Sequence, residues 1–74
     1  MGIDYTGEHF DSATLGEARG DALIATQHTG RPPTNFEIRD VCGRLLDPNS
    51  TFSDYGDTSD MKHLFLTPNI GAGG

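Results

Sequence analysis

Apolar and polar residues alternate in several short stretches of the chain, which is typical of strands with one buried face. Ile3 and Tyr5 alternate with polar neighbours near the start. A turn at Thr6-Gly7 would bring Ile3 opposite Phe10, so the pattern predicts a short N-terminal hairpin over residues 3–11. Further strands are predicted where apolar positions alternate or cluster, at residues 36–39, 45–46 and 61–66.

After the predicted hairpin, apolar residues recur at the spacing of a helix. Thr14 is a residue type that caps helix N-termini, and Glu17 lies three residues later, as in a capping box. The apolar stripe of this segment consists of Leu15, Ala18, Ala22 and Ile24 or Ala25. The chain is therefore predicted to form one helix that begins after Thr14 and ends near Gln27.

These elements predict an α+β domain in which one helix packs across a mixed sheet, because that packing buries the apolar faces of both layers. The expected order is strand, strand, helix, strand, short strand and strand. We expect one domain over residues 1–66 and a flexible C-terminal tail over 67–74, whose glycines have no side chains to bury. The predicted core consists of Ile3, Phe10, Leu15, Ala18, Ala22, Phe36, Ile38, Leu46, Phe52, Tyr55, Leu64 and Leu66.

With 74 residues, the chain has room for one domain with one small core. No second domain is available to form an active-site cleft, so we expect neither an enzyme nor a bound cofactor. Its apolar runs are far shorter than the ~20 residues that a membrane-spanning helix needs. The start also lacks the basic and apolar segments of a secretory signal. These features predict a cytoplasmic protein that does not associate with membranes.

Acidic residues outnumber basic residues by 11 to 5, which gives a formal net charge of −6. Such a chain repels phosphate, so its charge argues against nucleic acid or anionic lipid as a partner and favours a basic surface on another protein. The three histidines and Cys42 are scattered without the spacing of a ligand set, so no metal site is predicted.

The chain ends in Ile70-Gly71-Ala72-Gly73-Gly74, shortly after the apolar run 63–66. Glycine lets another molecule approach the backbone closely from any direction. Such an end can be threaded into a narrow channel, where its terminal carboxylate meets an activating reagent. Gly74 is therefore the candidate acyl donor.

From residue 32 onward, several blocks occur in the order, and nearly at the spacing, found in ubiquitin. They are Pro32-Pro33, Gly43, Thr51-Phe52-Ser53-Asp54-Tyr55, His63-Leu64-Phe65-Leu66 and Gly73-Gly74. Over residues 30–74 the chain thus resembles the ubiquitin-like proteins, and its Gly-Ala-Gly-Gly end is most similar to bacterial members. The resemblance implies a β-grasp fold, and we expect a monomer.

The resemblance also implies a function as a protein modifier. An E1-like activating enzyme would use ATP to adenylate Gly74, with Gly73 beside it and Ala72, Gly71 and Ile70 in the enzyme's channel. The acyl group would then pass to an amine of a target protein, with an E2-like enzyme and a JAB-type peptidase as further partners. Two alternatives stay open. One is a sulfur carrier like those of thiamine and molybdopterin synthesis, and the other is a noncovalent interaction module with an idle tail.

Two departures from ubiquitin affect the partners that the resemblance implies. Arg39 replaces the isoleucine at the centre of ubiquitin's receptor patch, whereas His63 and Phe65 occupy the other half of that patch. The three residues are therefore a candidate surface for a different partner. Arg44 stands where ubiquitin has its principal linkage lysine, which leaves Lys62 as the only lysine.

Overall fold

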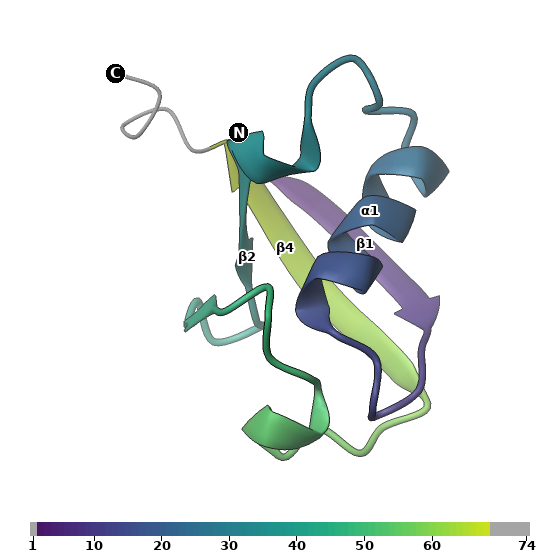
Figure 1. Cartoon of the computed structure of the whole chain (residues 1–74), viewed down its shortest axis with the longest axis vertical. Coiled ribbons are helices and arrows are strands. Elements are labelled where there is room, and N and C mark those ends of the chain that lie inside the picture. The colour runs from purple at the N-terminus through teal and green to yellow at the C-terminus, as the bar shows by residue number, and fades with distance from the viewer. Residues whose placement is uncertain (1, 69–74) are drawn as a thin grey trace.

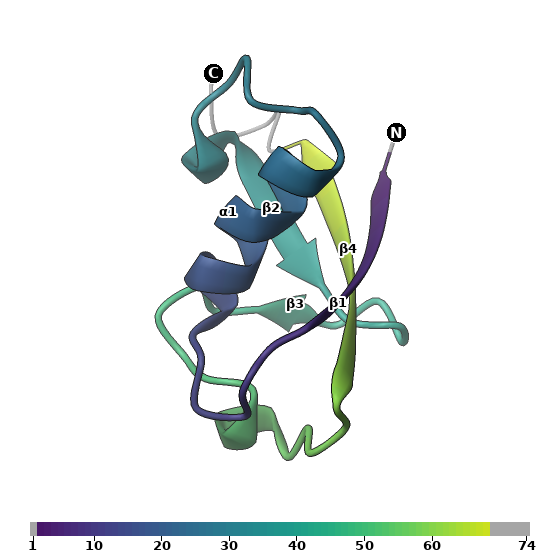
Figure 2. The same cartoon turned by 90° about the vertical axis from the view of Figure 1, so that its right-hand side faces the viewer.

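In the part of the chain that the structure describes, four strands form one sheet and a single helix crosses one of its faces; Figure 1 shows this arrangement. The computed structural model describes residues 2–68 of the chain. Its elements are β1 (Ile3–Glu8), α1 (Leu15–Ala25), β2 (Phe36–Arg39), β3 (Leu45–Leu46) and β4 (Met61–Pro68), with short 3-10 turns at Pro33–Asn35 and Ser53–Tyr55. The protein is therefore an α+β domain, and Figure 2 shows α1 lying to one side of the strands.

The strand order is β1-β4-β2-β3, and every pair of neighbours is antiparallel. The prediction of a mixed sheet is therefore wrong for the described strands. β4 has a neighbour on each side, so Leu66 lies opposite Ile3 of β1 and opposite Ile38 of β2. The strand that leads toward the C-terminal glycines is thus in the interior of the sheet.

The predicted N-terminal hairpin is also wrong. Residues Thr6 and Gly7 continue β1 as an ordinary strand, and all six residues of β1 pair with β4. This pairing sets Ile3 beside the core leucines of β4, whereas a local hairpin would pair only a few residues with each other. Phe10 then lies beyond the strand with 84% of its surface exposed, so it is not a core residue.

The predicted helix start is confirmed. Thr14 and Glu17 form the capping box in both directions, with each backbone N–H donating to the other residue's side chain at 3.2 Å. The helix ends at Ala25, two residues earlier than predicted. Gln27 takes a positive φ of 61°, and the His28 N–H donates to the Leu23 carbonyl at 2.7 Å, which closes the helix in a Schellman arrangement.

The core lies between α1 and the sheet, and its composition is mostly as predicted. The buried apolar residues are Leu15, Ala18, Ala22, Leu23, Phe36, Ile38, Leu46, Phe52, Leu64 and Leu66. Ile3 and Tyr55 are only partly buried against them. Leu23 was not predicted, although it lies eight residues after Leu15, a spacing that shares one face of a helix.

β4 extends further than the sequence predicted. Thr67 and Pro68 belong to it and pair with Glu37 and Phe36 of β2, so the strand continues two residues past its predicted end at residue 66. Within residues 2–68, no helix is both long enough and apolar enough to cross a membrane.

Candidate functional site

Gly74, the predicted acyl donor, follows β4 in the chain. Leu64 and Leu66 anchor this strand in the core with almost no exposed surface. The predicted conjugation residues Gly73 and Gly74, and the channel residues Ile70, Gly71 and Ala72, lie outside the described residues. The described part of the site is therefore the strand that leads to them and the surfaces around it.

The candidate partner surface predicted from sequence, Arg39, His63 and Phe65, comes together on the sheet face that points away from α1. Arg39 of β2 lies opposite Phe65 of β4. The rings of His63 and Phe65 are adjacent, with their centroids 4.9 Å apart. The pleat explains this placement, because these residues alternate along their strands with the core residues Ile38 and Leu64.

Acidic side chains border this outer face. Asp4 of β1 lies opposite Phe65, and its Oδ1 is 2.6 Å from Nε2 of His63. Arg39 is held by Glu37, at 3.0 Å between Nη2 and Oε2, and also donates to the Gly43 carbonyl at 2.9 Å. The surface is therefore an aromatic pair beside an arginine whose charge is already matched by a neighbouring carboxylate.

The burial of Lys62 was not predicted from the sequence. Its side chain is completely buried, and its Nζ donates to Asp11 Oδ1 at 2.6 Å and to the Asp57 carbonyl at 3.3 Å. Nζ also lies 3.6 Å from the Asp57 carboxylate and 5.2 Å from the centre of the Phe52 ring. A signal was present, because Lys62 is two residues before Leu64 and so shares its face of the strand.

The charges of this cluster stabilise one another. Burial by itself lowers the pKa of Lys62, but the hydrogen bond to Asp11 and the two carboxylate charges outweigh it, so the pKa lies above its ordinary value of 10.5. Burial likewise raises the pKa of Asp57, but hydrogen bonds from Ser59 and the charge of Lys62 outweigh it and hold the pKa below 3.8. Lys62 is thus a protonated, paired cation inside the fold.

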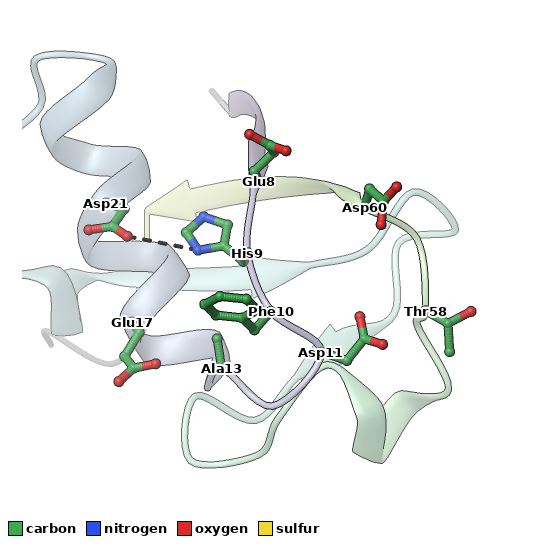
Figure 3. A pocket seen from close by; sticks show the side chains of 9 residues that line it. All are labelled: Glu8, His9, Phe10, Asp11, Ala13, Glu17, Asp21, Thr58 and Asp60. Atoms are coloured by element: carbon green, nitrogen blue, oxygen red, sulfur yellow. Dashed lines mark ion pairs between the residues drawn. The ribbon is translucent and has the colours of Figure 1, made fainter.

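An acidic hollow of about 880 Å³ opens beside this cluster. Figure 3 shows that its side chains come from the end of β1, the following loop, α1 and the loop before β4. Its lining residues are Glu8, His9, Phe10, Asp11, Ala13, Glu17, Asp21, Thr58 and Asp60. His9 hydrogen-bonds the Tyr5 hydroxyl at 2.8 Å and lies 3.8 Å from Asp21. The hollow combines an exposed aromatic ring with five carboxylates.

Among residues 2–68, no three or more histidine, cysteine or acidic side chains are grouped so that they could hold a metal ion.

Comparison with known proteins finds one matching family model, described as "Protein of Unknown function (DUF2604)", over residues 6–74. That match spans nearly the whole chain, including the C-terminal glycines. A search of curated proteins finds no match.

Proposed function

Since the chain belongs to the DUF2604 family, whose description assigns no function, we propose one from the chemistry of the chain itself: it is a ubiquitin-like protein modifier. Gly74 is the acyl donor, an E1-like enzyme activates it with ATP, and an amine of a target protein receives it. The chain is a substrate of these enzymes in the cytoplasm, where ATP is available, and not itself an enzyme. Its fold is then a shortened β-grasp.

The observation that carries this proposal is the position of β4. The strand is anchored in the core between two neighbouring strands, and its last residue, Pro68, is six residues before the terminal glycine. Six extended residues can span about 20 Å. A segment of that reach, ending in Gly73-Gly74, can enter a narrow enzyme channel while the domain remains folded outside it.

The proposed chemistry has three steps, and each has a named leaving group. The Gly74 carboxylate attacks the α-phosphate of ATP, and pyrophosphate leaves, which forms an acyl adenylate. A cysteine thiolate of the activating enzyme attacks the carbonyl carbon and AMP leaves. The target amine then attacks the thioester, and the thiolate leaves as the amide bond forms.

The fold offers two surfaces that enzyme partners could contact during these steps. The outer face presents His63 and Phe65 beside Arg39, and the acidic hollow presents Phe10 among carboxylates. A partner with a basic surface fits the hollow because of charge complementarity. An E2-like enzyme and a JAB-type peptidase remain further proposed partners.

The test is an activation assay with the cognate activating enzyme and ATP, followed by intact-mass analysis. The wild-type chain should form a covalent adduct, whereas a chain that lacks Gly74 should form none. Gly73→Val should also react poorly, because a β-branched side chain stiffens the backbone and fills the channel. Gly30→Val is the matched control, since a Cβ at exposed Gly30 meets no atom within 4 Å. Adduct formation by the truncated chain would contradict the proposal.

The same assay distinguishes the two alternative functions. With sulfide added to the assay, a sulfur carrier would form a thiocarboxylate when sulfide attacks the acyl adenylate and AMP leaves. This exchange of one carboxylate oxygen for sulfur adds about 16 Da and produces no protein-sized adduct. A noncovalent module would keep its original mass under all conditions.

A further inference from the structure

We infer that copies of this chain are not linked to one another through lysine, because its only lysine cannot serve as the acceptor for a second copy. This inference rests on the proposed function. It adds which lysine amines can receive the acyl group of Gly74. Lysine-linked polymers of the chain do not form, and any lysine amine that receives Gly74 belongs to another protein. The inference follows from the way the fold surrounds Lys62.

Lysine-linked polymers need a lysine on the modifier itself, and the sequence contains only Lys62. The four other basic residues are arginines, whose guanidinium groups stay protonated and do not accept acyl groups. The capacity for such polymers therefore depends entirely on whether the Lys62 amine can reach a thioester carbonyl.

The structure keeps the Lys62 amine away from any external acyl donor. The side chain has no exposed surface, and it is enclosed by two loops that are distant in sequence. Asp11 in the loop after β1 and Asp57 in the loop before β4 contact its Nζ, and the Phe52 ring lies 5.2 Å from it. An approaching thioester would have to separate these loops.

The chemical state of the amine also opposes attack. An amine must lose a proton before its lone pair can attack a carbonyl. Here Nζ donates hydrogen bonds to Asp11 and to the Asp57 carbonyl, and a second carboxylate lies close by. These partners stabilise the ammonium form, so Lys62 is both inaccessible and non-nucleophilic in the folded chain.

Amine acetylation tests this inference without any conjugating enzyme. The native wild-type chain is treated with an N-hydroxysuccinimide ester of acetate, and modification of Lys62 is followed by peptide mass analysis. The matched control is Arg31→Lys, which adds a lysine at an exposed loop position. We expect Lys62 to react about 100-fold more slowly than the lysine introduced at position 31, because it reacts only after local opening. In denaturant the two rates should become equal. Similar rates in the native chain would overturn the inference.

Conjugation then tests the consequence for polymers. With the activating system and ATP, the wild type and Lys62→Met should give the same adducts, and peptide mass analysis should find no copy linked to Lys62. Arg31→Lys should add species that carry two or more linked copies. Polymers that form with the wild type and disappear with Lys62→Met would overturn the inference. If no chain forms any adduct, the proposed function fails, whereas the acetylation result still decides whether Lys62 is accessible.

Discussion

Neutralising both carboxylates that face Lys62, with the double substitution Asp11→Asn and Asp57→Asn, should destabilise the domain more than removing Lys62 itself. Asparagine keeps the shape of each side chain but leaves a fully buried ammonium group without a counter-charge. Lys62→Met instead removes the buried charge and places an unbranched apolar side chain beside Phe52.

The expected losses of unfolding free energy depend on how deeply the charged groups are buried. Removing one partner of a buried ion pair typically costs about 3–5 kcal/mol. In this cluster Asp11 and Asp57 are 46% and 35% exposed, so water already screens part of the attraction. We therefore expect a loss of about 2–3 kcal/mol for the double variant and less than about 1 kcal/mol for Lys62→Met. A domain of this size has a total stability of about 4–11 kcal/mol, so the larger loss is a substantial fraction of it.

Urea unfolding followed by circular dichroism measures this difference. With a slope of about 1 kcal/mol per molar urea, the double variant should unfold at about 2–3 M lower urea than the wild type. Asp60→Asn is the control, because it removes an exposed carboxylate of the same hollow that makes no ion pair with Lys62. If Lys62→Met is as destabilising as the double variant, attraction outweighs desolvation and the reasoning is refuted.

Three further predictions concern the strands and the pH range of stability. Gly7→Ala should destabilise the domain by about 1–3 kcal/mol in thermal unfolding, because the new Cβ would collide with the ring and hydroxyl of Tyr5; an unchanged melting temperature would contradict the placement of that ring. The contribution of Asp57 to stability should be complete above pH 3.8 and be lost as the pH falls through its lower folded-state pKa. Urea unfolding at pH 3 and pH 6 should therefore show a smaller difference between wild type and Asp57→Asn at pH 3, and an equal difference would be inconsistent with the depressed pKa. Arg39→Ile should raise the affinity for ubiquitin-binding domains from undetectable to weak in a titration, since it joins exposed Leu45 and Phe65 into one apolar row; measurable binding by the wild type would refute this.

The sequence alone determined the elements that depend on local interactions. Thr14 and Glu17 predicted the helix start correctly, because a capping box involves only residues within one helical turn. The alternation around Ile38 and Leu64 identified two strands and their buried faces, because side chains alternate along a strand wherever it pairs. The same alternation placed Arg39 and Phe65 on the opposite face.

Only the tertiary structure decided which strands pair and which charges meet. The alternation of residues 3–8 is compatible with a local hairpin and with pairing to a distant strand. Pairing with β4 prevails because it places Ile3 and Tyr5 against the core. Lys62 lies 51 residues from Asp11 in the chain, and no local pattern records that contact. Local propensity specifies where helices and strands form. Which strands pair and which ion pairs are buried depends instead on how much apolar surface the whole chain buries.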